Sequence, residues 1–361
     1  MSPIRVLALV TLPTLGAGNR LRIEQYAPSL RPHGIELDVS PFFDAAAHDV
    51  LYRPRHLVAK ALGVLRGFAR RARDLWRARR YDLVLVYRES APLGPPVVEA
   101  LLGMLRVPYV YDFDDAIFVR PPYSANRAWD WLRPPSRVAS TARGAQEVIV
   151  GNEYLAESAR KWNARVTIIP TPVDTERHRP RTTARPVGPL VLGWVGSQTT
   201  APYLHLIDDA LTDLARRHHF VVRVVGGPYE HGSALVEQLA YDLEREPADL
   251  ESFDIGLLPE PDDAWTRGKG AFKALLYMAT GLPVVASKVG VNPEVVVEGE
   301  TGFCVGTTDE WVRSLDQLLT DSELRRRLGA SGRQRLLERY SLQVQAPRLA
   351  KVLRDGATTS A

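Results

Sequence analysis

The chain has 361 residues, of which 45% are hydrophobic and 24% charged, and a formal net charge of +4. Its length exceeds what one hydrophobic core usually serves, so we expect two domains of an ordinary globular protein. No apolar run approaches the roughly 20 residues that cross a bilayer, and the single cysteine, Cys304, excludes an internal disulfide and a cysteine-rich metal site. These features predict a cytoplasmic protein.

Short apolar runs alternate with helical stretches through the first half of the chain. The expected strands span 6–10, 35–39, 83–87, 109–111, 148–150 and 166–169. Such alternation predicts a parallel sheet covered by helices. We assign residues 1–175 to a first Rossmann-like domain.

The segment from Arg53 to Arg80 is strongly basic, with ten Lys or Arg residues and one acid, Asp74. Apolar residues recur in it at helical spacing, namely Leu57, Ala61, Leu65, Phe68, Ala72 and Trp76. The pattern predicts a basic amphipathic helix, whose apolar stripe either faces the core or docks on an anionic membrane surface. We expect no nucleic-acid partner, because no helix-turn-helix or aromatic-rich strand pattern accompanies the charge.

Prolines at 170, 172, 180, 186 and 189 mark an extended connection, after which a second alternation begins. Its expected strands span 190–195, 220–225, 255–258 and 283–286. We assign 186–340 to a second Rossmann-like domain and predict that a final helix in 341–361 returns to the first. The fold class is therefore α/β with two tandem Rossmann-like domains, which usually face a ligand-binding cleft.

A glycine-containing turn follows the first strand of each domain. Gly196 and Ser197 open a helix whose amide groups could hold a phosphate, although a tight turn without a ligand explains them equally well. The matching turn of the first domain contains Gly16, Gly18, Asn19 and Arg20. Its glycine spacing is not the dinucleotide fingerprint, so a nicotinamide cofactor is disfavoured.

Two lysines, Lys269 and Lys273, lie at the expected start of a helix in the second domain. Cations beside the amide groups of a helix start are typical of a site for an anionic ligand, and a diphosphate fits well. Solvated lysines on an exposed first turn are the alternative. The lysines are flanked by the strand Asp254-Ile-Gly-Leu-Leu-Pro259 and the run Tyr277-Met-Ala-Thr-Gly-Leu-Pro-Val-Val-Ala286.

This order of motifs resembles the retaining family 4 glycosyltransferases. Gly196-Ser197, the Asp254 strand, Gly281 to Ala286, Glu294 and Gly302-Phe303 all fall in the family's order. The resemblance implies the GT-B fold, a nucleotide sugar held chiefly in the second domain, an acceptor in the first, and no metal or other cofactor. It assigns donor binding to Gly196, Ser197, Lys269, Gly270, Ala271, Phe272 and Glu294.

The sequence departs from that family at the residues that usually engage the sugar and the ribose. The family's paired glutamates would fall on Gly268 and Leu276, and the segment Ser197-Gln-Thr-Thr200 offers no cation. We expect Lys269 and Lys273 to serve as the cations of the diphosphate instead, and we count Lys273 among the catalytic candidates.

Three acids cluster where the strand at 109–111 ends, in Tyr111-Asp112-Phe113-Asp114-Asp115. The resemblance places Asp114 and Asp115 at the family's catalytic His-Asp pair, and Asp112 with the glycine turn of the first domain on the acceptor side. Acids this close repel, so at least one needs a cationic partner or a raised pKa. A helix-capping role and a metal site at Asp112 and Asp114 are alternatives.

The expected function is metal-independent, retaining transfer of a hexose from a UDP- or GDP-sugar to a hydroxyl of a sugar or lipid-linked acceptor. Synthesis of a cell-surface polysaccharide, glycolipid or other glycoconjugate is the expected setting, with residues 53–80 as a candidate contact to the inner face of the membrane. An inactive nucleotide-sugar-binding partner subunit, or a sugar-nucleotide epimerase of the same fold, is the alternative.

Overall fold

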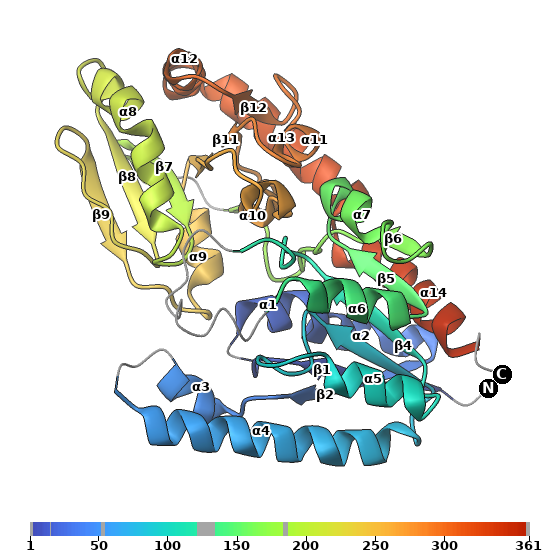
Figure 1. Cartoon of the computed structure of the whole chain (residues 1–361). Coiled ribbons are helices and arrows are strands. Elements are labelled where there is room, and N and C mark those ends of the chain that lie inside the picture. Colours follow the sequence, from blue (N-terminus) through green and yellow to red (C-terminus); the bar gives the residue numbers. More distant parts are fainter. Residues whose placement is uncertain (1–2, 15, 52–54, 121–133, 183–186, 359–361) are drawn as a thin grey trace. The chain divides into compact units, whose positions relative to one another are not determined.

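The computed structural model divides the chain into two compact units (Figure 1). Unit 1 contains Met1–Pro172 and Leu342–Ala361, and unit 2 contains Val173–Ser341. The structure describes residues 3–14, 16–51, 55–120, 134–182 and 187–358. Arg53 and residue 186, the predicted start of the second domain, lie outside the described residues.

Unit 1 is built on a parallel six-stranded sheet in the order β2-β1-β3-β4-β5-β6. Its strands are β1 (Ile4–Val10), β2 (Ile35–Pro41), β3 (Leu83–Tyr87), β4 (Tyr109–Phe113), β5 (Glu147–Val150) and β6 (Val166–Ile168). Strands β3 and β4 are buried along their whole length, as is typical of strands covered on both faces, and β3 is a continuous apolar run.

The helices of unit 1 cover this sheet. They are α1 (Ala17–Asn19), the π-helical turn η1 (Arg20–Glu24), α2 (Tyr26–Leu30), the 3₁₀ turn η2 (Arg31–His33), α3 (Ala45–Leu51), α4 (Leu57–Ala78), α5 (Val97–Met104), α6 (Ser136–Gly144), α7 (Glu153–Ala159) and α14 (Leu342–Thr358). Helix α14 packs with α2 over β1 and β3, and its Leu349 and Leu353 belong to the same core as Leu83. The predicted return of the last helix to the first domain is confirmed.

Unit 2 repeats the architecture with a parallel sheet in the order β12-β11-β10-β7-β8-β9. Its strands are β7 (Leu190–Val195), β8 (Phe220–Val225), β9 (Leu235–Leu239), β10 (Ile255–Leu258), β11 (Val284–Ser287) and β12 (Gly302–Val305). Its helices are η4 (Ala201–Ile207), α8 (Asp208–Ala215), α9 (Glu246–Glu251), η5 (Thr266–Gly268), α10 (Phe272–Ala279), α11 (Asn292–Val295), α12 (Thr308–Thr320) and α13 (Ser322–Arg339).

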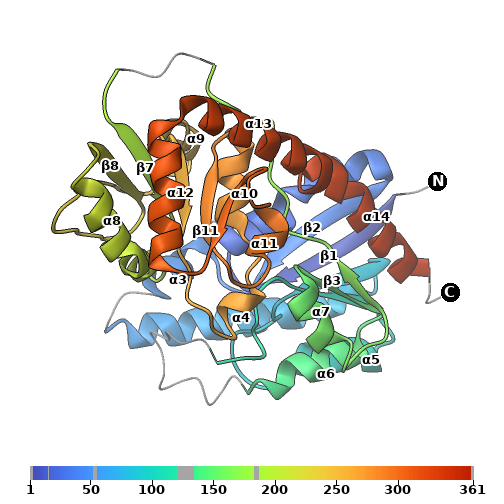
Figure 2. The same ribbon diagram turned by 90° about the horizontal axis from the view of Figure 1, so that it is seen from above.

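Alternate residues of β7 supply the two cores of unit 2. Val191 and Val195 join the core beneath α10, whereas Leu192 and Trp194 join the core beneath α8 and α12. Figure 2 shows α8 and α12 side by side on that second face. The predicted α/β class with two Rossmann-like sheets is confirmed, although β9 and β12 were not among the predicted strands.

Among the described residues, no helix combines the length and the apolar character that a bilayer crossing requires.

Helix α4 packs against the rest of unit 1 through its glycines. A Cβ atom on Gly67 would lie 2.2 Å from Cε1 of the buried Phe42. We therefore predict that Gly67→Ala lowers the free energy of unfolding by about 1–3 kcal/mol, the usual effect of overpacking. The matched control is Gly103→Ala in α5, where a Cβ would meet nothing within 4 Å and the helix should be unchanged or slightly stabilised. Equal melting temperatures for the two variants would contradict this packing.

Candidate active site

In unit 2 the candidate donor-binding residues gather at the carboxyl ends of the neighbouring strands β7 and β10. The turn at Gly196 and Ser197 follows β7, and Glu260 follows β10 after one proline. Lys269 and Lys273 come from the segment that leads into α10 and from the first turn of that helix. The carboxyl edge of a parallel sheet is the usual ligand position in folds of this type.

Lys273 is half-buried against the glycine turn. Its Nζ lies 3.3 Å from Oγ1 of Thr200 and 4.8 Å from the centre of the Trp194 ring. A Cβ on Gly196 would lie 2.9 Å from Cε of Lys273 and 2.5 Å from the Trp194 ring, so only glycine admits this approach. Burial lowers the pKa of Lys273 to about 8, against the opposing effect of the Glu260 carboxylate.

Lys269 is held by a buried carboxylate that the sequence patterns did not single out. Its Nζ lies 3.3 Å from Oε1 of Glu260 and 4.6 Å from the centre of the Tyr203 ring. The second oxygen of Glu260 accepts a hydrogen bond from Nδ2 of Asn292 at 3.1 Å, and its backbone N–H donates to Oγ of Ser287 at 2.8 Å. Glu260 therefore joins the loops after β10 and β11 to the lysine segment. The sequence signal that could have identified Glu260 is its position directly after the strand motif that ends at Pro259.

The chain turns sharply before α10. Ala271 adopts a left-handed conformation with φ of +52°, which a residue with a Cβ rarely adopts. A Cβ on the neighbouring Gly270 would meet nothing within 4 Å. The first amide groups of α10, beginning at Phe272, are outside the helix's own hydrogen-bond pattern and can serve an anion. One short segment, which begins with the left-handed turn at Ala271, thus supplies both the first backbone N–H groups of α10 and the Lys273 side chain.

Other positions singled out in unit 2 have different surroundings. Glu294 is exposed on α11, and its carbonyl oxygen accepts a hydrogen bond from Arg335 at 2.6 Å. Leu276, which stands where the family has a glutamate, is buried in the core of unit 2. Gly268, at the other such position, is buried at the end of η5. The role of Glu294 in donor binding stays a prediction.

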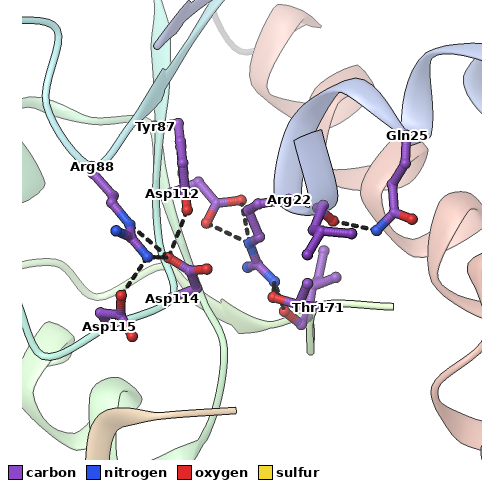
Figure 3. Close-up of polar contacts among 10 residues, drawn as sticks. Arg22, Gln25, Tyr87, Arg88, Asp112, Asp114, Asp115 and Thr171 are labelled. Carbon is purple, nitrogen blue, oxygen red and sulfur yellow. Dashed lines mark hydrogen bonds and ion pairs between the residues drawn. The ribbon is translucent and has the colours of Figure 1, made fainter. Parts of the chain in front are cut away.

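In unit 1 the acids at the carboxyl end of β4, Asp112 within the strand and Asp114 and Asp115 after it, are paired with arginines (Figure 3). Asp112 is buried, and Nε of Arg22 lies 2.9 Å from its Oδ1. Nη1 of Arg22 also donates to the carbonyl oxygen of Ile169 at 2.6 Å and to Oγ1 of Thr171 at 3.2 Å. Burial raises the pKa of Asp112 to about 6, although the charge of Arg22 opposes this.

Asp114 and Asp115 share the guanidinium of Arg88. Nε of Arg88 donates to Oδ1 of Asp114 at 2.8 Å, the hydroxyl of Tyr87 donates to the same oxygen at 2.9 Å, and Nη2 of Arg88 pairs with Asp115. Burial acts to raise the pKa of Asp114, but the charges of Arg88 and Arg22 outweigh it and the pKa lies below its ordinary value. The prediction that at least one acid of this cluster needs a cationic partner or a raised pKa agrees with these contacts.

The glycine turn of the first domain lies against this cluster. A Cβ on Gly18 would lie 3.0 Å from the hydroxyl of Tyr87, so the turn approaches closely where glycine stands. Asn19 is buried and donates to Glu24 at 2.7 Å, and Arg20 donates to the carbonyl oxygen of Thr14 at 3.4 Å. Gly16 precedes the short helix α1. The structure thus brings Gly18 to Tyr87 and Arg88, the two residues that contact Asp114, and places Asn19 and Arg20 in contacts of the turn itself.

The alternative of a metal site at Asp112 and Asp114 meets competition from these ion pairs, because Arg22 and Arg88 contact the carboxylates that a cation would use. Over the described part of the chain, no group of three or more His, Cys, Asp or Glu side chains is arranged to hold a metal ion.

Comparison with known proteins matches both units. A model of glycosyltransferase family 4 matches residues 22–177, and a model of the group 1 glycosyl transferases matches residues 271–335. The chain is 28% identical over 226 residues to a D-inositol 3-phosphate glycosyltransferase of Corynebacterium urealyticum, covering 53% of this chain and 51% of that protein. An enzyme of the same name from Corynebacterium efficiens is 26% identical, covering 90% and 80%.

Solved structures show the same fold at low sequence identity. Sucrose-phosphate synthase from Thermosynechococcus elongatus has a TM-score of 0.71 at 17% identity, covering 98% of this chain and 99% of that one. The Anabaena protein HepE in complex with UDP-glucose has a TM-score of 0.64 at 16% identity, covering 98% and 100%. The fold is therefore GT-B, and the chain belongs to the family 4 glycosyltransferases. It spans about half the length of the first curated relatives it matches.

The buried ion pair of Arg22 and Asp112 generates a prediction about stability. Arg22→Met should lower the stability of unit 1 by about 3–5 kcal/mol, because it leaves a buried carboxylate without its cation. Protonation of Asp112 relieves that penalty, so the loss should be smaller below the wild-type pKa of about 6 than well above it. Thermal unfolding of the wild type and the variant, below this pKa and well above it, measures the pH dependence of the loss. The exposed Arg31→Met is the control. A loss that does not change with pH would show that Asp112 is not the destabilised group.

Proposed function

We propose that this chain is a retaining glycosyltransferase that moves a hexose from a UDP- or GDP-sugar to a hydroxyl acceptor without a metal ion. The observation that carries the proposal is the convergence of Lys269 and Lys273 with the Gly196 turn at the carboxyl edge of the unit 2 sheet. Burying an ammonium group is unfavourable unless an anion compensates it. Glu260 supplies one negative charge for two lysines, and a bound diphosphate would supply further negative charge to balance the second lysine.

The donor's diphosphate fits the groups in unit 2. Lys269, Lys273 and the first amide groups of α10 are donors to phosphate oxygens, and all come from one segment of chain. HepE, which shares the fold, is described in complex with UDP-glucose, which supports a nucleotide sugar as donor here. Because Gly268 and Leu276 replace the family's glutamates, other groups must orient the donor. Glu260 is a carboxylate in contact with Lys269 and is one such group.

In the proposed reaction, the bond between the anomeric carbon and the diphosphate oxygen breaks while an acceptor oxygen bonds to the same carbon from the same face. The acceptor's proton passes to the departing diphosphate oxygen. Negative charge grows on the diphosphate during this step, so cations held in place beforehand stabilise the transition state more than the ground state. Lys273 is the proposed catalytic residue in unit 2, because its contacts with the Trp194 ring and Thr200 fix its position.

The acceptor is assigned to the carboxyl edge of unit 1. Arg88 pairs with both Asp114 and Asp115 and helps to hold the pKa of Asp114 below its ordinary value, so these carboxylates are suited to accept hydrogen bonds from sugar hydroxyls and to stabilise positive charge at the transferred sugar. Asp112 and the turn from Gly16 to Arg20 complete the acceptor side. We propose a sugar or lipid-linked acceptor in the synthesis of a polysaccharide, glycolipid or other glycoconjugate at the cytoplasmic side of the membrane.

A screen of nucleoside diphosphates and their sugars tests the proposal. UDP, GDP, UDP-glucose and GDP-mannose are added to the full chain in EDTA, and the melting temperature is measured. A ligand at 100 times its Kd should add about 2.7 kcal/mol of stability. The same mixtures are then assayed for loss of the donor sugar with and without sugar acceptors. Stabilisation by none of these ligands, or turnover that needs Mg²⁺ or Mn²⁺, would overturn the proposal.

One observation favours an inactive partner subunit as the second candidate. Neither Gly268 nor Leu276 can present a carboxylate, and both are buried. Stabilisation by a nucleotide sugar without transfer or hydrolysis would support that role. Conversion of the donor sugar without any acceptor would instead indicate an epimerase.

The two lysines give a prediction about affinity. Lys273→Ala and Lys269→Ala should each weaken UDP or GDP binding by roughly 1.5–3 kcal/mol, about 10- to 150-fold in Kd, the range for charge-assisted hydrogen bonds. Calorimetric titration measures it, with Arg326→Ala, an exposed residue of α13, as the control. Wild-type affinity in both lysine variants would remove them from the donor site.

A second prediction concerns pH. The pKa of Lys273 is lowered to about 8, so nucleotide affinity should fall by up to about tenfold per pH unit as pH rises above that value. Glu260 acts to raise this pKa, so Glu260→Gln should move the midpoint to lower pH. Lys273→Ala should lack the transition and serves as the control. Identical pH profiles for the wild type and Lys273→Ala would assign the titration to another group.

A further inference from the structure

Helix α4 places small and charged residues toward unit 1. Its buried residues are Gly63, Gly67, Arg71, Asp74 and Ala78. Gly67 lies against the ring of Phe42, and a Cβ on Gly63 would come within 3.0 Å of Ala47. No large aliphatic side chain of α4 is among its buried residues. The face of α4 that packs against the rest of unit 1 is therefore not the apolar stripe identified in the sequence.

A buried ion pair fixes this orientation. Nη1 of Arg71 lies 2.8 Å from Oδ2 of Asp74, which also accepts a hydrogen bond from the hydroxyl of Ser40 at 2.7 Å. Arg71 further donates to the carbonyl oxygens of Ser90 at 2.6 Å and Val10 at 2.7 Å. Rotating the helix to bury its apolar stripe would expose Gly67 and break these charge-assisted hydrogen bonds.

The apolar stripe faces away from unit 1. The large side chains of the stripe, together with the neighbouring Val58 and Leu62, are between 43% and 75% exposed; those of the stripe are Leu57, Leu65, Phe68 and Trp76. The interpretation of the stripe as a core-facing surface is therefore wrong for this helix. Phe68 contacts Phe42 edge-on at a centroid distance of 5.2 Å and also lines a cavity of about 110 Å³ with Leu93 and Val97. The exposed apolar surface thus continues from α4 to the loop before α5.

Cations border this surface. Arg66 and Arg73 are exposed on one flank, and Arg79 and Arg80 follow the helix end, where Arg80 stacks on the Trp76 ring at 4.5 Å. Arg70 and Arg77 belong to the same flank and pair with Asp44 and Asp38. The only acid of α4, Asp74, is buried beneath the helix. An exposed apolar stripe with a cationic border is complementary to an anionic lipid surface.

We propose that α4 docks unit 1 on the surface of an anionic bilayer, with Leu65 and Trp76 inserted among the lipids and Arg66 and Arg73 at the head groups. Figure 1 shows α4 as a long helix alongside the unit 1 sheet, and no other described helix or strand of that unit covers its outer side. A second copy of the chain is a poorer occupant, because pairing α4 with itself brings arginine flanks together and α4 has no exposed acid to compensate them. This inference does not depend on the sugar-transfer proposal.

Co-sedimentation of the full chain with vesicles tests the proposal. Wild type should bind vesicles of phosphatidylcholine mixed with phosphatidylglycerol, bind pure phosphatidylcholine far more weakly, and dissociate as salt is raised. Leu65→Ser with Trp76→Ser, and separately Arg66→Glu with Arg73→Glu, should each lower the partition coefficient at least about tenfold. All four residues are exposed, so the melting temperature should stay at the wild-type value.

Matched substitutions in unit 2 provide the controls. Leu235→Ser with Leu337→Ser removes exposed apolar residues, and Arg313→Glu with Arg326→Glu reverses exposed charges, and both pairs should bind vesicles as wild type does. Negligible wild-type binding to anionic vesicles at low salt would overturn the proposal. So would unchanged binding of the serine variant, or a wild-type dimer in sedimentation equilibrium that the serine substitutions dissociate. Retained nucleotide binding in every variant would keep this result separate from the test of the donor site.

Discussion

Buried charged side chains hold separate segments of each unit together. A buried charge is tolerated only when an opposite charge and hydrogen-bond partners compensate it, so each such group ties together the segments that supply its partners. In unit 1, Arg22 joins its π-helical turn to β4 and to the segment after β6. In unit 2, Glu260 joins the loops after β10 and β11 to Lys269. The carboxyl edges of the two sheets, where we propose the substrates bind, are thus held in place by ion pairs that would contact those substrates.

The same rule explains why α4 is the reverse of an ordinary surface helix. Helical periodicity identifies a stripe and its opposite face, but it does not state which of them faces the protein. Arg71 and Asp74 neutralise each other, and Gly67 allows the helix to approach Phe42, so the charged and small face is the one that fits unit 1. The large apolar residues are left at the surface as a result.

The sequence predicted the central strands and the lysine segment because both are local signals. Strands such as β3 and β7 are continuous apolar runs, whereas β9 carries Glu237 and Gln238 at the sheet edge and lacks such a run. The arginine partners of the acids were missed for a different reason. Arg22 and Asp112 are 90 residues apart, and only the order of strands brings them together. Arg88 offered a weak local signal, since it directly follows β3 beside the strand that ends in the acids.

The membership of α14 in unit 1 has a consequence for synthesis on the ribosome. Residues 173–341 form unit 2 as one continuous stretch, but the core of unit 1 includes Leu349, Val352 and Leu353. Until those residues emerge, the face of the unit 1 sheet that they cover stays open to water and to other chains. Domains usually complete their folding in the order of synthesis. Here we expect the order to be reversed, so that the part synthesised first is the last to close its core.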